Sequence, residues 1–189
     1  MEHTSIKFNS TFLISAIIII TLILFSCENK IDSIKKSDFL SYPAVTAKNF
    51  ETIFTDSGKL QLIMRAPLME QYNSGELPYT EFRFGLKTIF YDGKPSPVAS
   101  TTSKYARYNK PNNLWELKDS VVVINEGGDK LETEVLYWDQ GKNLIYTDRF
   151  VKITNEDQIV MGTGFESDSR FVKRKIKKVT ATINLKDEK

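Results

Sequence analysis

Two segments of the chain, Asn113–Glu126 (NLWELKDSVVVINE) and Asn143–Glu156 (NLIYTDRFVKITNE), carry the same pattern thirty residues apart. In both segments the apolar residues recur at every second position, which is typical of a half-buried β-strand. An echo of strand-like units at fixed spacing indicates a stacked or rolled β architecture, because such a unit cannot bury its apolar face alone. The two segments therefore predict a β-sheet fold with open ends.

The rest of the chain after residue 45 carries further strand patterns. Residues 60–66 alternate apolar and polar side chains, and Pro67 is expected to end that strand or to place it at a sheet edge. Residues 82–86 predict another strand, and 179–185 predict a last one. No segment in this part of the chain has a sustained helical period. The sequence therefore predicts one all-β domain of many short antiparallel strands.

Polar residues interrupt both echoed segments. The interruptions are Lys118–Ser120 in the first segment and Asp148–Arg149 in the second. A polar break within an apolar alternation predicts a bend between two short strands.

The N-terminus has the features of a targeting segment. Lys7 precedes a nearly continuous apolar run, Phe12–Phe25, which is shorter than the roughly 20 residues that a spanning helix needs. The run ends just before Cys27, in a context that resembles a bacterial lipobox, so we expect lipid attachment at Cys27. The alternative is an uncleaved anchor helix. Either way we expect a membrane-tethered protein outside the cytoplasm, with a targeting segment over 1–27, a tether over 28–45 and a folded domain over 46–187.

The folded domain lacks the residues on which most catalytic sites depend. The one histidine, His3, and the one cysteine lie in the targeting segment. This excludes from the domain a Ser-His or Cys-His site, and zinc or iron held by histidine or cysteine. There is no phosphate-binding glycine loop, and the net charge of +2 gives no bulk attraction to nucleic acid. We therefore expect a binding protein with no cofactor and no metal.

Two groups of charged residues leave alternatives open. Carboxylates that could pair as acid and base are more simply explained as residues of bends and strand ends; they are Asp119, Asp139, Asp148, Glu166 and Asp168. A basic cluster over 170–178 is either a solvated approach to the last strand or a patch for lipid phosphates or an acidic partner.

An ordered set of short motifs resembles a known family. The set is Trp115-x-Leu117, Val121, Leu131-x-Thr133, Leu136-x-Trp138, Ile145-x-Thr147, Val151-x-Ile153 and Gly162-Thr163-Gly164-Phe165. It resembles the LptC family of lipopolysaccharide export, of the LptA/OstA-like class, over about residues 45–185. The lipobox departs from the family, whose members keep a transmembrane helix.

The resemblance implies a single β-jellyroll that is open at both ends and holds acyl chains of lipopolysaccharide in its apolar interior. It also implies an N-terminal edge toward the inner-membrane ABC transporter complex and a C-terminal edge toward an LptA-like bridge protein, at the periplasmic face of the inner membrane. The alternative is a surface or periplasmic β-sandwich lipoprotein that binds protein or glycan.

The candidate site residues follow from the alternation. The common phase of the echoed strands predicts one shared apolar interior, and the resemblance implies that this interior binds lipid; its lining is expected to be Trp115, Leu117, Val121, Val123, Ile145, Val151, Ile153, Ile159 and Met161. The last strand is expected to be a partner-binding edge that includes Val179, Ala181 and Ile183, because an open sheet leaves unpaired backbone groups on its terminal strands.

Overall fold

The computed structural model describes residues 14, 42–73, 77–169, 171 and 173–185. From residue 42 onward the described residues form one antiparallel sheet of eleven strands, without a helix. The strands are β1 (Val45–Asp56), β2 (Lys59–Tyr72), β3 (Tyr79–Phe82), β4 (Leu86–Phe90), β5 (Ala99–Ser103), β6 (Tyr105–Asn109), β7 (Leu114–Asn125), β8 (Lys130–Asp139), β9 (Leu144–Thr154), β10 (Gln158–Ser167) and β11 (Arg174–Asn184). The prediction of an all-β jellyroll-type fold is confirmed.

The sheet divides into two layers between β2 and β7. The segment 62–65 of β2 pairs with β4, which continues through β5 to the second half of β7. The segment 70–72 of β2 pairs instead with β3, which continues through β6 to the first half of β7. Each of the two long strands thus belongs to both layers, and the space between the layers is the interior of the domain.

The long strands change layers at points marked by unusual backbone. In β7 the change falls at Asp119 and Ser120, which both have positive φ angles (62° and 57°), and there the pairing with β8 shifts register. Gly85 connects the two layers between β3 and β4, with a φ of 96°, and a Cβ there would lie 2.8 Å from the Ser103 carbonyl oxygen. Only glycine fits this corner without displacing the backbone of the neighbouring strand.

Two of the predictions for single strands need correction. β2 does not end at Pro67 but continues to Tyr72, and it has strand partners on both sides. Among the described residues, Pro67 itself is paired with no residue of β1, β3 or β4. Its missing N–H therefore breaks no ladder hydrogen bond. The predicted strand over 82–86 is two strands, because the chain turns at Gly85, and Phe84 is exposed there.

The echoed segments form β7 and β9, with β8 between them. Each begins after an asparagine with positive φ, Asn113 (50°) and Asn143 (51°), so the two hairpin turns are equivalent. The polar interruptions do not divide either segment into two short strands. Each continues as one long strand, because a local register shift absorbs the bend without ending the pairing.

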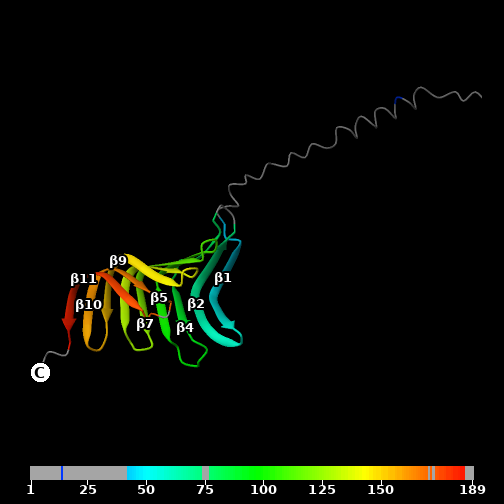
Figure 1. The fold of residues 1–189 in the computed structure, drawn as a ribbon. Helices are drawn as coiled ribbons and strands as arrows, with labels where there is room; N and C mark the ends of the chain where they lie inside the picture. Colours follow the sequence, from blue (N-terminus) through cyan, green and yellow to red (C-terminus); the bar gives the residue numbers. More distant parts are fainter. Residues whose placement is uncertain (1–13, 15–41, 74–76, 170, 172, 186–189) are drawn as a thin grey trace, which may run out of the picture. The chain divides into compact units, whose positions relative to one another are not determined.

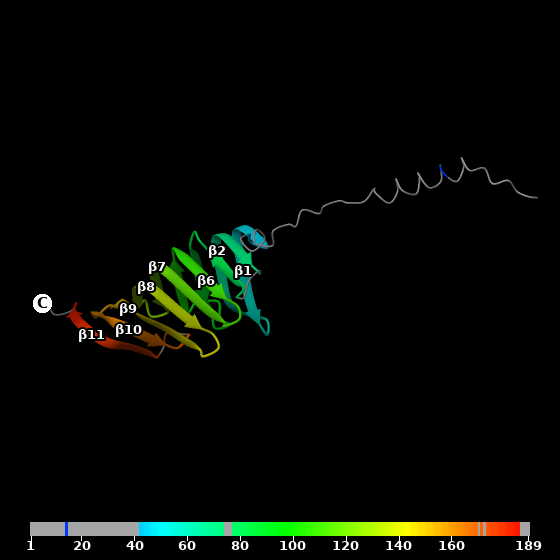
Figure 2. The ribbon, with the colours of Figure 1, turned by 90° about the horizontal axis from the view of Figure 1, so that it is seen from above.

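The two outermost strands lie at opposite ends of the domain (Figure 1), and the view from above shows the succession from β1 to β11 (Figure 2). Among the described residues, β1 pairs only with β2, and β11 pairs only with β10. Each therefore leaves one edge of backbone N–H and C=O groups without a strand partner from the described part of the chain.

Candidate functional site

The interior between the two layers contains most of the residues predicted to line it. Six of them are buried in the main hydrophobic cluster, and the half-buried Ile153 packs against it. The six are Trp115, Leu117, Val121, Val123, Ile145 and Val151. Val121 and Val151, which are equivalent in the two echoed segments, are both 0% exposed. The echo therefore places matched residues on the same inward face.

Two predicted interior residues lie on the other face. Ile159 pairs with Thr154 and Met161 with Lys152, whereas Val160 pairs with the inward Ile153. Directly paired residues share a face of the sheet. Ile159 and Met161 therefore lie on the outer face. The prediction assumed that odd-numbered residues face inward in β10 as they do in β9, but the turn between the two strands reverses this alternation.

Other strands supply interior residues that the pattern of the echoed segments did not include. They are Met64, Phe82, Leu86, Leu131, Leu136 and Phe165, all buried in the same cluster. Leu136 directly faces Leu117 across β7 and β8. The sequence shows that Leu136 and Trp138, two residues apart, lie on the same face of β8. Whether that face is the inward one depends on the register between β8 and β7.

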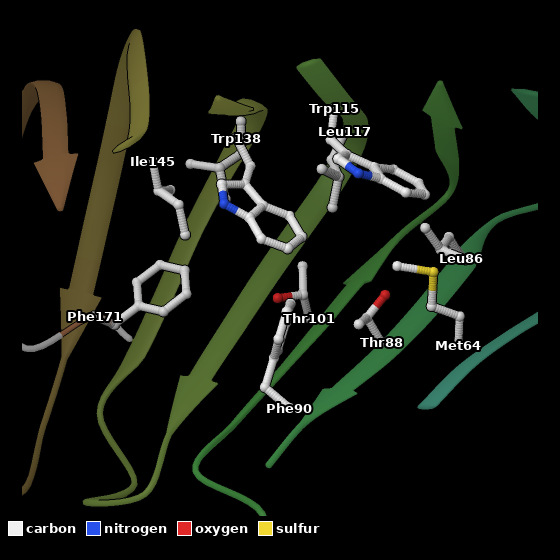
Figure 3. Close-up of a pocket in the computed structure, with 11 residues that line it drawn as sticks. Met64, Leu86, Thr88, Phe90, Thr101, Trp115, Leu117, Trp138, Ile145 and Phe171 are labelled. Atoms are coloured by element: carbon white, nitrogen blue, oxygen red, sulfur yellow. The ribbon is translucent and has the colours of Figure 1, made fainter. Parts of the chain in front are cut away.

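A small cavity lies within this interior (Figure 3). Its volume is about 20 Å³, which is room for about one water molecule. Its walls are mostly apolar; they are Met64, Leu86, Thr88, Phe90, Thr101, Trp115, Leu117, Leu136, Trp138, Ile145 and Phe171. An acyl chain therefore requires movement of these side chains.

Aromatic rings form much of the wall of this cavity. Trp115 stacks on Tyr108, with ring centroids 4.7 Å apart, and also on Phe82, with ring centroids 5.9 Å apart. Phe90 meets Trp138 edge to face at 5.6 Å. Such pairs add to the stability from burial and hold the rings in defined orientations.

Phe171 enters the interior from the connection between β10 and β11. Its side chain is 4% exposed, and its backbone has a φ of 55°, which is uncommon for a bulky residue. The Phe171 N–H donates to the Asp168 carbonyl oxygen at 3.0 Å, which closes a turn. Next to it, Arg174 of β11 forms an ion pair with Asp129 of the β7–β8 turn. Phe171 has no counterpart in the alternation of the strands, so the sequence pattern did not identify it.

The charged groups of the outer face are arranged in pairs. Arg83 Nε lies 2.8 Å from Glu81 Oε2 and 2.9 Å from Glu70 Oε2, and the Tyr105 hydroxyl donates to Glu81 Oε1 at 2.6 Å. Burial, together with this hydrogen bond, raises the pKa of Tyr105 well above its ordinary value. Tyr105 therefore stays protonated and acts as a structural donor.

The carboxylates that could have formed a catalytic pair are dispersed. Asp139 pairs with Lys142 at 2.8 Å and Glu166 with Lys177 at 2.7 Å, and these bonds lower the pKa of each carboxyl. Asp119 lies at the register shift of β7, and Asp148 is near Arg149 (3.5 Å) on the surface. Asp168 accepts from the Lys173 N–H at 3.3 Å. Among the described residues, no three Asp, Glu, His or Cys side chains are placed to hold a metal ion.

The basic cluster extends into β11, while Arg170 lies outside the described residues. Two of its members are engaged within the domain, Arg174 with Asp129 and Lys177 with Glu166. Lys173, Lys175 and Lys178 are exposed. The predicted edge residues also belong to β11, where Val179 and Ile183 are 57% and 46% exposed and Ala181 is half-buried.

The predicted anchor at Cys27 lies outside the described residues. In the described part of the chain, no helix has the length and apolar character needed to cross a membrane.

Residues 12–184 match the model of the family described as "LptC: Lipopolysaccharide-assembly, LptC-related". No curated protein sequence matches the chain.

Proposed function

Since the chain belongs to the LptC-related lipopolysaccharide-assembly family, we propose that it carries lipopolysaccharide between membranes by holding the acyl chains between its two β-layers. In this proposal it receives the lipid from an inner-membrane ABC transporter complex and passes it to an LptA-like bridge protein, without covalent chemistry. It acts at the periplasmic face of the inner membrane, where Cys27 or an N-terminal helix tethers it.

The observation that carries the proposal is the interior itself. It is walled mostly by aliphatic and aromatic side chains from both layers. Of the ion pairs described above, only that of Arg174 with Asp129 lies beside it. An apolar interior of this kind suits acyl chains, and burying apolar surface supplies most of the binding free energy for such a ligand.

The two terminal strands support the second part of the proposal. An unpaired edge accepts a strand from another protein through main-chain hydrogen bonds. We propose that β11, with Val179, Ala181 and Ile183, accepts the bridge protein, and that β1 faces the transporter. The exposed lysines of β11 would steer an acidic partner or lipid phosphates toward that edge.

Photo-crosslinking in living cells tests the interior. A photoreactive amino acid at Val123, which is 2% exposed, should give an adduct with lipopolysaccharide, whereas the same amino acid at the neighbouring Ile124, 42% exposed, should not. Equal adducts at both positions, or none at Val123, would contradict an interior lipid site. Fractionation tests the location: retention at the inner membrane supports export, and exposure on the cell surface supports a protein- or glycan-binding lipoprotein.

A further inference from the structure

One row of residues crosses the interior face of five neighbouring strands. From β6 to β10 its members are paired in succession: Tyr108 with Trp115, Trp115 with Trp138, Trp138 with Ile145, and Ile145 with Ser167. Residues paired directly across strands have Cβ atoms about 5 Å apart on the same face. The row therefore brings two indole N–H groups and one serine hydroxyl into line along an apolar wall.

These three polar groups have no partner among the described residues. Trp115 Nε1, Trp138 Nε1 and Ser167 Oγ are buried atoms without a hydrogen bond there. Trp115 is 8% exposed and Ser167 is 3% exposed. Buried polar groups in folded proteins are nearly always paired, because an unpaired donor loses its hydrogen bonds to water without replacement. Three such groups in one row leave hydrogen-bond donors along this wall that are not used within the described part of the chain.

Both tryptophans belong to the lining of the cavity. Both indoles project between the layers, and the nitrogen of Trp138 lies on the side of Ile145 and Phe171 (Figure 3). An indole nitrogen donates and does not accept. The missing partner is therefore a hydrogen-bond acceptor that arrives with an apolar ligand.

We propose that this row binds the carbonyl oxygens of ester- or amide-linked acyl chains, with Trp115 and Trp138 donating from Nε1 and Ser167 from its hydroxyl. The inference rests on the proposed function and names the part of the lipid that the interior recognises. A plain hydrocarbon has no hydrogen-bond acceptor for these donors, whereas an acyl chain has a carbonyl oxygen at the end that is joined to its headgroup.

Entry of the chain requires space that the small cavity does not provide. Phe171 is the lining residue supplied by a turn rather than by a strand, and its ring lies beside Trp138 and Ile145 (Figure 3). Displacing this ring breaks no strand pairing, because Phe171 lies outside the strands. The acyl chain would take the place of the Phe171 ring, next to the row of donors.

The composition of the chain makes a direct test available. Both of its 2 tryptophans belong to the row, so intrinsic tryptophan fluorescence reports only on this site. The intact protein is titrated with the decanoyl ester of glycerol and with the decyl ether of glycerol, which share chain and headgroup and differ by the carbonyl. We expect the ester to bind about three- to tenfold more tightly, the ratio that one net hydrogen bond supplies.

Variants assign the preference to the indole groups. The ratio of ester to ether affinity should fall toward one in Trp115→Phe and in Trp138→Phe. Replacing both tryptophans with 3-benzothienylalanine keeps the ring size and removes the N–H, and calorimetry should then show the same loss of preference. In the control Phe90→Leu, both affinities should change together, because Phe90 contacts Trp138 through carbon atoms only.

The outcomes separate this inference from the proposed function. Equal binding of the ester and the ether by the unmodified protein overturns the inference and leaves the interior lipid site standing. An ester preference that persists in the benzothienylalanine protein overturns the assignment to the indoles. Binding of neither probe overturns the interior lipid site itself.

Discussion

Replacing Gly162 with alanine should loosen the terminal strand from the sheet. Gly162 lies on β10, opposite Val179 of β11. A Cβ added there would lie 2.4 Å from the Lys178 carbonyl oxygen and 2.5 Å from Ile176 Cγ2. Ile176 Cγ2 belongs to a side chain that can change rotamer, but the Lys178 oxygen belongs to the backbone of β11 and retreats only if the strand moves.

The magnitude follows from this geometry. Bringing the 2.4 Å contact out to 3.0 Å moves the backbone of β11 by about 0.6 Å, which lengthens its hydrogen bonds to β10. Overpacking of this kind costs about 1–3 kcal/mol. Alanine recovers about 0.4–1 kcal/mol by restricting the unfolded chain. We therefore expect a net loss of about 1–2 kcal/mol in the free energy of unfolding.

Urea denaturation measures that loss, and hydrogen exchange shows where it falls. Amide protection should drop along β11 and remain unchanged in β7, because strands at the edge open independently of the central sheet. Gly127→Ala is the matched control, since the nearest atom to its Cβ is Asn125 Oδ1 at 3.5 Å. The reasoning is refuted if Gly162→Ala is as stable as Gly127→Ala and β11 keeps its protection.

Four further predictions follow from the fold and the proposals. Val151→Asp places a charge at a fully buried position, so it should destabilise the domain by about 3–5 kcal/mol in urea denaturation; a loss below about 1 kcal/mol would show that the position is hydrated. Ala181→Pro should reduce co-purification of the bridge protein while lipid loading survives, because proline removes a donor from β11; intact co-purification by a folded variant would place the junction elsewhere. Cys27→Ser should leave an uncleaved, heavier precursor on a gel, whereas unchanged mobility would support a retained helix. The hydrogen bond from Lys130 lowers the pKa of Glu132, so the stability that this pair adds is present at neutral pH and is lost as the pH falls through that lowered pKa. Glu132→Gln should therefore make the free energy of unfolding less dependent on pH in the acid range. An unchanged pH profile would contradict the pairing.

The closed interior bears on how such a protein would carry lipid. With a volume of about 20 Å³, the interior cavity has no room for an acyl chain in this conformation. The side chains that fill the space are held by packing rather than by ion pairs, except at the β11 end, where Arg174 and Asp129 join β11 to the β7–β8 turn beside Phe171. The proposed exchange of the Phe171 ring for an acyl chain would take place beside this ion pair.

Alternation along the sequence was sufficient to predict an all-β domain and the inward face of β7 and β9. The reason is that side-chain direction in a strand has a period of two, so a local pattern identifies the buried face. Trp115, Val121, Val123 and Val151 were predicted correctly as interior positions on this basis, although their role in binding lipid stays a proposal. The absence of histidine and cysteine from the domain was likewise decided by composition alone.

The tertiary structure alone decided how the strands relate to one another. Turns and register shifts reset the phase between strands, which is why Ile159 and Met161 face outward although they continue the numbering pattern of β9. The same long-range pairing divides the sheet into two layers, brings Phe171 into the interior from a turn, and aligns Trp115, Trp138 and Ser167 in one row. Register is set by contacts between residues far apart in the chain, so no local pattern contains it.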